Sequence, residues 1–260
     1  MTPLAVAVLG LGEAGSRLAA NLASAGADVR GYDPDETAGS ELPGRVAEAE
    51  AAVGAADVVL SVNAGRAALA AARSALPALS PAALYADLNT AAPELKRELA
   101  ALVGAARFAD VALLGPVPRR GLGTPALASG PGSRAFADIL GPLGMPVEVV
   151  SSQAGDAASR KLIRSVFTKG MAASAIEALD AAAEAGEAEW LRGEIAEMIG
   201  AELLQRLVDG SRTHAVRRLD EMRAACELLV ELGVEPDVAR ASASVLSRLA
   251  SEGAEAPGLE

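Results

Sequence analysis

The stretch that most constrains the fold of this chain lies within its first 25 residues. An uncharged apolar run, residues 4–10 (LAVAVLG), leads into Gly10-Leu11-Gly12-Glu13-Ala14-Gly15 and then into an apolar-periodic stretch over 16–25. A strand, a glycine-rich turn and a helix in this order predict the start of a βαβ unit that binds a dinucleotide. Gly10 permits the tight turn, Gly12 lets a pyrophosphate approach the backbone, and Gly15 lets the helix pack closely on the strand. The N–H groups of the first helical turn then face the phosphates.

A carboxylate stands at the end of the second predicted strand. Residues 28–32 (DVRGY) predict this strand, and Asp33 follows it, 18 residues after Gly15. This is the spacing of the carboxylate that accepts hydrogen bonds from the adenosine ribose hydroxyls. A carboxylate repels a 2′-phosphate, so NAD is expected as the cofactor, with NADP still open because of Arg30 and Arg45. The alternative is a glycine turn of another α/β protein, followed by an acid at this spacing by chance.

Composition and charge restrict the class of protein. The 260 residues are 51% hydrophobic, which predicts a large buried core, and the formal net charge is −11. An acidic chain disfavours nucleic acid and anionic membranes as partners. Cys226 is the one cysteine, so we expect no internal disulfide and no metal site. The sequence shows no secretory signal and no uncharged run of the roughly 18 residues that a membrane span needs. We therefore expect a cytoplasmic protein.

Strand-like and helix-like segments alternate through the first 150 residues. Runs such as 57–62 (DVVLSV) and 84–88 (LYADL) alternate with helical patterns, and a short strand is expected at 45–47. This alternation predicts a mostly parallel sheet covered on both faces. From residue 156 the pattern is helical almost throughout. We therefore predict a Rossmann-type, doubly wound α/β domain over residues 1–152, followed by an all-helical domain over 153–260.

Small and polar residues follow the ends of the predicted strands. In an open parallel sheet, ligands bind outside the carboxyl ends of the strands. Asn89 and Thr90 can hydrogen-bond a ribose or an amide there, or can instead cap the helix that follows. Arg119, in a predicted loop over 116–125, can pair with a carboxylate or phosphate, or can simply be solvated. The candidates at these strand ends are Val62, Asn63, Asn89 and Thr90 for the cofactor, and Gly115, Pro116 and Arg119 for the substrate.

The first helix of the second half carries basic and hydroxyl side chains near its start. Lys161, Ser165 and Thr168 fall at positions i, i+4 and i+7, which places them on one face. Arg160 and Arg164 flank Lys161, and neighbouring like charges make an ammonium group lose its proton more readily. Lys161 is therefore a candidate catalytic residue, and Arg164, Ser165 and Thr168 are candidates for binding substrate. A solvated or intersubunit basic turn explains the same spacing.

Four motifs resemble those of the β-hydroxyacid dehydrogenase family, the group of 3-hydroxyisobutyrate dehydrogenase and the cofactor domain of 6-phosphogluconate dehydrogenase. They are GLGEAG at 10–15, DLNTAAP at 87–93 against D-x-S-T-x-x-P, DVALLGP at 110–116 against D-A-P-V-S-G-G, and Gly155 with Lys161 against G-x-G-x-x-x-K-x-x-x-N. The resemblance implies a Rossmann-type domain, a helical C-terminal domain for substrate and dimerisation, and a homodimer. It also implies that Lys161 is the catalytic lysine and that the cofactor is NAD or NADP.

The half of the chain that would bind substrate departs from the family pattern. The departures include Leu114, Pro116, Ser165 and Asp220, where the family has Ser, Gly, Asn and Lys. The segments DLNTAAP, DVALLGPVPRRGLGTP, RSVFTKGM and HAVRRLDEM resemble an offshoot with its own type of C-terminal domain. Within that domain His214, with Arg217 and Arg218, can bind an anionic substrate, or can belong to an ordinary surface helix.

The glycine turn and Lys161 together predict an NAD(P)-dependent oxidoreductase. It would transfer hydride between nicotinamide and a small, acidic hydroxy or oxo compound, with Lys161 stabilising the charge that develops on the substrate oxygen. Two alternatives stay open. An imine reductase shares the architecture but usually replaces the lysine, and a sensor or scaffold protein binds NAD(P) without chemistry.

Overall fold

The structure is a computed structural model that describes residues 2–104 and 107–255. The chain divides into two compact units, an N-terminal unit of residues 1–161 and a C-terminal unit of residues 162–260. The helix α7 (Asp156–Glu184) begins in the N-terminal unit and continues into the C-terminal unit. The functional domains 1–152 and 153–260 remain our proposal, and the two units are described separately below.

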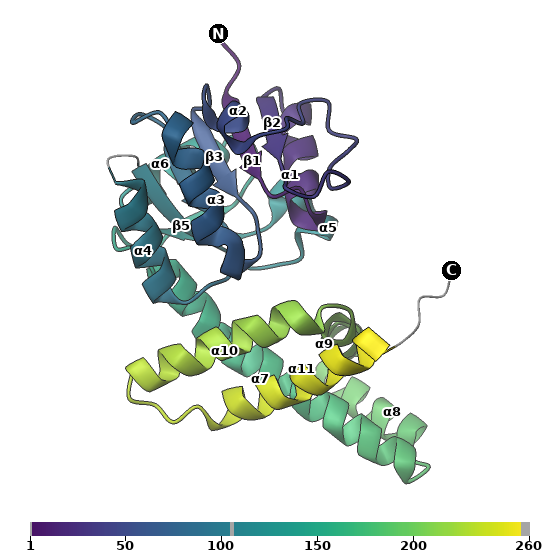
Figure 1. The fold of residues 1–260 in the computed structure, drawn as a ribbon. Helices are drawn as coiled ribbons and strands as arrows, with labels where there is room; N and C mark the ends of the chain where they lie inside the picture. The colour runs from purple at the N-terminus through teal and green to yellow at the C-terminus, as the bar shows by residue number, and fades with distance from the viewer. Residues whose placement is uncertain (1, 105–106, 256–260) are drawn as a thin grey trace. The chain divides into compact units, whose positions relative to one another are not determined.

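A seven-stranded sheet forms the centre of the N-terminal unit, in the order β2-β1-β3-β4-β5-β6-β7. Figure 1 labels four of its strands, β1, β2, β3 and β5. The strands are β1 (Ala5–Leu9), β2 (Asp28–Tyr32), β3 (Val58–Ser61), β4 (Leu84–Asp87), β5 (Arg107–Leu113), β6 (Ala126–Ser129) and β7 (Val147–Val149). Strands β1 to β5 are parallel, β6 is antiparallel to β5, and β7 is parallel to β6. The carboxyl ends of β1 to β5 therefore lie at one edge of the sheet, as a mostly parallel arrangement requires.

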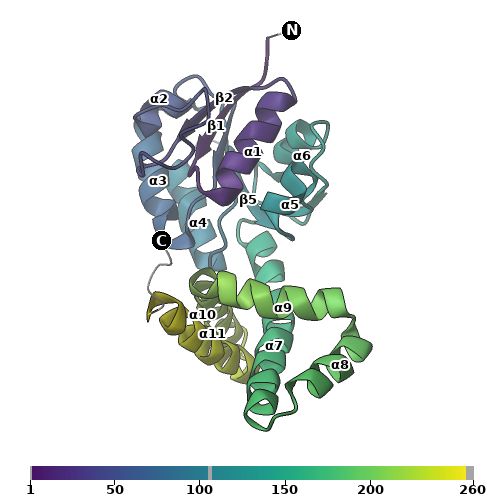
Figure 2. The same ribbon diagram turned by 90° about the vertical axis from the view of Figure 1, so that its right-hand side faces the viewer.

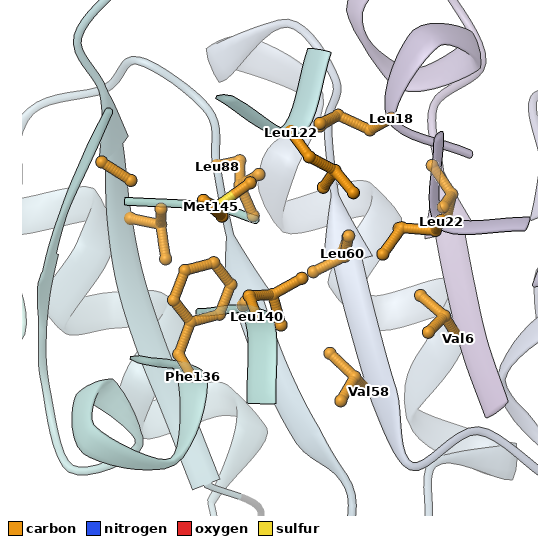
Figure 3. Packing of buried hydrophobic residues seen from close by; sticks show 14 of the residues in the cluster. Val6, Leu18, Leu22, Val58, Leu60, Leu88, Leu122, Phe136, Leu140 and Met145 are labelled. Atoms are coloured by element: carbon orange, nitrogen blue, oxygen red, sulfur yellow. The ribbon is translucent and has the colours of Figure 1, made fainter. Parts of the chain in front are cut away.

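Helices cover both faces of the sheet because the strand side chains alternate between two apolar clusters. In β1, Val6 and Val8 join the first cluster, and Ala7 and Leu9 join the second. The first cluster includes Leu22 and other side chains shown in Figure 3. Its helices are α1 (Glu13–Ser24), α5 (Val117–Arg120) and α6 (Ser133–Leu140), and those of the second are α2 (Ala49–Val53), α3 (Ala68–Ala75) and α4 (Pro93–Val103). This confirms the doubly wound Rossmann-type fold.

Two segments of the N-terminal unit differ from the sequence-based expectation. The pattern predicts a loop over 116–125, but the structure places α5 and a 3₁₀ helix, η3 (Gly121–Gly123), there. These turns form because Val117 and Leu122 bury their apolar side chains in the first cluster. Residues 45–47 form no strand, and Arg45 makes only a single bridge to Gly31.

The C-terminal unit is helical in the part that the structure describes (Figure 2). Besides α7 it contains α8 (Ala188–Ile199), α9 (Ala201–Thr213), α10 (Ala215–Glu231) and α11 (Asp237–Glu255). Buried side chains such as Ile176, Leu204 and Met222 form its core. Within residues 2–104 and 107–255, no helix is long and apolar enough to cross a membrane.

The ends of two C-terminal helices depart from the sequence pattern. Periodicity predicts one helix over 188–208, but Gly200 adopts a φ of 87° and separates α8 from α9. Glycine reaches this left-handed conformation without steric cost. The sequence also predicts a mobile tail over 251–260, whereas α11 extends to Glu255. Residues 256–260 lie outside the described part of the chain.

Candidate functional site

The glycine turn connects β1 to α1 at the carboxyl edge of the sheet. Gly10 has a φ of 98°, and a Cβ there would lie 2.4 Å from the carbonyl oxygen of Val62 and 2.5 Å from Oδ1 of Asn63. A Cβ at Gly15 would lie 1.8 Å from the carbonyl oxygen of Gly10, whereas a Cβ at Gly12 would have no neighbour within 4 Å. Backbone therefore closes the turn at Gly10 and Gly15, and space is open at Gly12. This arrangement fits the pyrophosphate of a dinucleotide.

The other residues of the motif lie beside this open space. Glu13 and Ala14 are the first residues of α1, whose N-cap Gly12 provides no capping side chain. The N–H groups of this helical turn can therefore bind an anion. The N–H of Leu11 donates to Oδ2 of Asp33 (2.7 Å), which ties the turn to the end of β2.

The segment after β2 concentrates negative charge. Oδ1 of Asp33 accepts the N–H of Asp35 (2.9 Å), and hydrogen bonds from Thr37 lower the pKa of the Asp35 carboxyl. The guanidinium of Arg45 donates to the carbonyl oxygens of Asp33 (3.2 Å), Asp35 (3.0 Å) and Ala38 (3.0 Å). Arg45 thus holds the backbone of this segment together, beside the two carboxylates.

Amide side chains line the ends of β3 and β4. Nδ2 of Asn63 donates to Oγ of Ser61 (2.9 Å), and Nδ2 of Asn89 donates to the same oxygen (3.0 Å) and to Oδ1 of Asp87 (2.5 Å). Asn89 is only 4% exposed, yet its Oδ1 has no hydrogen-bond partner among the described residues. Buried polar atoms nearly always have a partner. This oxygen is therefore suited to accept a hydrogen bond from a ligand.

Lys161 lies at the same edge of the sheet, in the second turn of α7. Its Nζ donates to Oγ1 of Thr90 at 2.6 Å, and both residues belong to the N-terminal unit. Thr90 directly follows Asn89. The structure therefore brings the candidate catalytic lysine against the loop that follows β4.

A buried lysine that sequence reasoning missed lies behind this loop. Lys96 of α4 has a fully buried side chain, and its Nζ lies 2.5 Å from Oδ2 of Asp87 and 3.2 Å from Oδ1 of Asp110. Burial alone lowers the pKa of Lys96, but attraction to Asp87 and Asp110 outweighs it and raises this pKa above its usual value. The buried positions of α4 are Pro93, Lys96, Leu99 and Val103. A lysine among the apolar residues on the buried face of this helix is the sequence pattern that could have revealed Lys96.

Three of the substrate candidates lie at or after the end of β5. Gly115 and Pro116 precede α5, and Arg119 is an exposed residue of that short helix. The segment is held beside α1, where the N–H of Leu122 donates to Oδ1 of Asn21 (3.3 Å).

A second buried polar cluster lies in the C-terminal unit and comprises Ser165, Lys169 and Glu221. The hydroxyl of Ser165 donates to Oε1 of Glu221, and Nζ of Lys169 lies 3.0 Å from the same oxygen. Glu221 is 4% exposed. Burial lowers the pKa of Lys169, attraction to Glu221 opposes this, and Arg218 and Arg217 lower it further, so it lies below its usual value.

The remaining candidates of the C-terminal unit take different positions. Oγ1 of Thr168 is 3.5 Å from the carbonyl oxygen of Ser165, and Arg164 is exposed. His214 lies between α9 and α10. Ser165 is thus held by a buried charged partner, Glu221.

Two family models match the chain, in the order of its two units. The first, the NAD binding domain of 6-phosphogluconate dehydrogenase, matches residues 5–121, and the second, a domain of unknown function (DUF1932), matches residues 182–249. A solved structure of the conserved protein MTH1747, which is similar to 3-hydroxyacid dehydrogenases, is 27% identical and covers 95% of this chain and 96% of its own, with a TM-score of 0.71. These matches support the β-hydroxyacid dehydrogenase family for this chain. Its cofactor is NAD(P).

Two further relatives have no described activity. An uncharacterized 28.5 kDa protein of Methanothermus fervidus is 30% identical over 148 residues, which make up 56% of each chain. The matched part thus spans just over half of that relative. A conserved hypothetical protein from Sinorhizobium meliloti 1021 is 29% identical, with a TM-score of 0.72, and the match covers 100% of this chain and 92% of that one.

More distant solved structures share the fold. A Mycobacterium tuberculosis 3-hydroxyisobutyrate dehydrogenase solved with L-serine is 21% identical, covers 98% of this chain and 96% of its own, and has a TM-score of 0.80. An imine reductase from Aspergillus terreus, solved with NADPH4, is 19% identical with a TM-score of 0.64, and covers 100% of this chain and 98% of its own. The same architecture therefore occurs in more than one kind of oxidoreductase.

Proposed function

We propose that the protein is an NAD-dependent oxidoreductase that transfers hydride between nicotinamide and a small anionic hydroxy or oxo acid. The hydrogen bond from Lys161 Nζ to Thr90 Oγ1 (2.6 Å) carries this proposal. It fixes an ammonium group at the sheet edge that also holds the glycine turn. A cation held in place before the reaction stabilises charge in the transition state without a cost of reorganisation.

The cofactor and the residues of the chain have different roles in the proposed reaction. Bound NAD(P) supplies the hydride acceptor or donor. Nζ of Lys161 stabilises negative charge on the substrate oxygen and gives it a proton during reduction, and it takes the hydroxyl proton during oxidation. Oδ1 of Asn89, which is buried and has no partner among the described residues, accepts a hydrogen bond from the cofactor.

NAD is the proposed cofactor rather than NADP. The carboxylates of Asp33 and Asp35 lie at the end of β2, where the adenosine ribose binds in such folds. Arg45 is engaged with three backbone carbonyl oxygens, and Nη1 of Arg30 contacts the carbonyl oxygen of Ala51 (3.4 Å). Neither guanidinium is therefore held ready for a 2′-phosphate.

An acidic substrate is proposed because basic and hydroxyl side chains surround the lysine in the sequence. Arg164 and Ser165 follow Lys161 within one turn of α7. The proposed substrate contacts are Gly115, Pro116, Arg119, Arg164, Ser165, Thr168 and His214.

The test is a panel of small hydroxy acids with NAD and with NADP, followed by nicotinamide absorbance. Replacement of Lys161 by Ala is expected to lower turnover by about 10²–10⁴-fold, the usual contribution of a proton-transfer group, with NADH affinity nearly unchanged. Arg97→Ala is the control, because Arg97 is an exposed residue of α4 paired with Glu94, and its turnover should match wild type. Equal turnover in Lys161→Ala would remove Lys161 from the mechanism.

The same panel separates the rival functions. Turnover of cyclic imines but not of oxo acids would favour an imine reductase. Tight NADH binding with no turnover of any panel member would favour a sensor or scaffold protein.

We also propose a homodimer formed by the C-terminal units. An apolar groove of about 660 Å³ lies among α7, α8, α10 and α11. Ile163, Phe167 and Val238 on its walls are 49%, 68% and 54% exposed, and exposed apolar patches of this kind mark interfaces. Sedimentation should find a dimer that Phe167→Glu converts to a monomer. Val216→Glu, at an exposed apolar residue away from the groove, should stay dimeric. A wild-type monomer at all concentrations would refute this.

A further inference from the structure

One ammonium group lies between two carboxylates in the centre of the N-terminal unit. Asp87 of β4 and Asp110 of β5 are partners in register on neighbouring parallel strands, and both side chains are 0% exposed. Like charges side by side on neighbouring strands destabilise a sheet. Nζ of Lys96 lies 2.5 Å from one carboxylate and 3.2 Å from the other, so it compensates this repulsion.

The first set of contacts of Lys96 fixes the loop after β4. Its Nζ donates to Oδ2 and the carbonyl oxygen of Asp87 (2.5 and 3.0 Å) and to the carbonyl oxygen of Asn89 (2.8 Å). These three bonds use all three donors of a lysine. The carbonyl of Asn89 belongs to the peptide group that leads into Thr90. Lys96 therefore holds the backbone immediately before the residue that contacts Lys161.

The second set of contacts reaches the start of α7 through Asp110. Oδ2 of Asp110 accepts the N–H groups of Gly155 and Ala158 (3.1 Å each). A carboxylate at this place also interacts favourably with the helix dipole. Lys161 follows Ala158 by three residues, so the anchored turn is the one directly before the lysine.

We propose that Lys96 is a positioning residue that sets the placement of Lys161 Nζ relative to Thr90 Oγ1. The loop that carries Thr90 and the start of α7, which leads to Lys161, are both held by groups that contact Lys96 Nζ. This one atom therefore supports both sides of the hydrogen bond. A core that needed only stability would be served as well by apolar residues of similar volume. The relevance for catalysis rests on the proposed function, whereas the positioning itself does not.

Lysine labelling tests this positioning without a known substrate. The chain has three lysines, Lys96, Lys161 and Lys169, so trinitrobenzenesulfonate labelling of each can be followed by peptide mass spectrometry. Only the neutral amine reacts, and Thr90→Val removes the acceptor that favours the ammonium form of Lys161. Labelling of Lys161 should therefore accelerate, by up to about tenfold, the factor that corresponds to one pKa unit.

Lys96→Met should accelerate the labelling of Lys161 in the same way. Removal of the positive charge of Lys96 would by itself favour the ammonium form of Lys161 and so slow its labelling. An acceleration therefore shows that Lys161 Nζ has lost its position beside Thr90 Oγ1. In the double variant Lys96→Met with Thr90→Val, no further acceleration is expected, because both changes break the same hydrogen bond. Arg97→Met, which removes a charge from the exposed side of α4, is the control and should leave the rate unchanged.

Two results would overturn the proposal. One is a Lys161 labelling rate in Lys96→Met equal to or below that of wild type, and the other is additive acceleration in the double variant. If Lys96→Met does not fold, Asp110→Asn replaces it, since this variant keeps Lys96 paired with Asp87 and weakens the support of α7 together with the contact between Lys96 and Asp110. The same acceleration is expected. A failure of the proposed function would show instead in the substrate panel, with the labelling pattern intact.

Discussion

Each unit of the molecule buries one lysine against carboxylate, and the pKa values of the two lysines are shifted in opposite directions. Lys96 in the N-terminal unit has two carboxylates and no exposed surface, and its pKa is raised. Lys169 in the C-terminal unit has one carboxylate, Glu221, and its side chain is 16% exposed. Burial, with Arg218 and Arg217 nearby, lowers the pKa of Lys169. Burial disfavours both ammonium groups, so the number and sign of neighbouring charges decide the outcome.

Lys96 is therefore a structural cation, whereas the charge of Lys169 can change. Lys96 stays charged and holds a fixed geometry around it. Lys169 lies in a cluster where cations outnumber the carboxylate, which is the condition under which a lysine can release its proton. The next three experiments test that contrast, from the largest expected effect to the smallest.

Lys96→Met should be the most destabilising of these changes. Removal of one partner of a buried ion pair leaves an uncompensated charge and costs about 3–5 kcal/mol, and here two carboxylates lose their cation. Urea unfolding measures the loss in the free energy of unfolding. Arg97→Met, on the exposed side of the same helix, should change it little. Equal stability of the two variants would mean that Asp87 and Asp110 do not need Lys96.

Glu221→Gln should have a smaller effect. The amide keeps an acceptor for Ser165 and Lys169 but removes the charge, which costs about 1–3 kcal/mol for a buried group. Lys169 softens the loss because it can shed its proton. The same unfolding measurement applies, with the exposed Glu227→Gln on α10 as the control. A loss as large as that of Lys96→Met would contradict the contrast between the two lysines.

The dependence of stability on pH should have opposite signs for the two lysines. Below the usual lysine pKa of 10.5, the unfolded chain holds a proton that folded Lys169 has begun to lose, so its contribution to stability rises with pH. Lys96 keeps its proton longer in the folded state, so its contribution is full below 10.5 and falls as pH rises above it.

The slopes cannot exceed about 1.4 kcal/mol per pH unit for one proton. They are measured as the difference in unfolding free energy between wild type and Lys169→Met, and between wild type and Lys96→Met, over this range of pH. Slopes of the same sign for both lysines would contradict the account.

Local patterns made the fold and the cofactor edge predictable. The glycine turn, Asp33 and the alternation of strands and helices depend on residues that are close in sequence, and most elements formed near their predicted places. The 29-residue helix α7 is one example. The break at Gly200 and the turns over 117–123 were missed because a left-handed glycine and a packed apolar side chain interrupt the periodicity.

The buried pair of Lys169 and Glu221 and the contact of Asp110 with the start of α7 could not be predicted because their partners lie far apart in sequence. Lys169 and Glu221 are separated by 52 residues, and Asp110 and Ala158 by 48. Lys96 was the exception that sequence could have shown, since it falls on the same face as Leu99 and Val103.

The most direct test of the central claim asks whether a bound nicotinamide lies against Lys161. Trinitrobenzenesulfonate labelling of Lys161 is measured alone, with saturating NADH, and with saturating ADP-ribose, which lacks the nicotinamide ring. The account predicts that NADH protects Lys161 and that ADP-ribose does not, with Lys169 as the internal reference. Labelling of Lys161 at the same rate with bound NADH as without it would contradict the account.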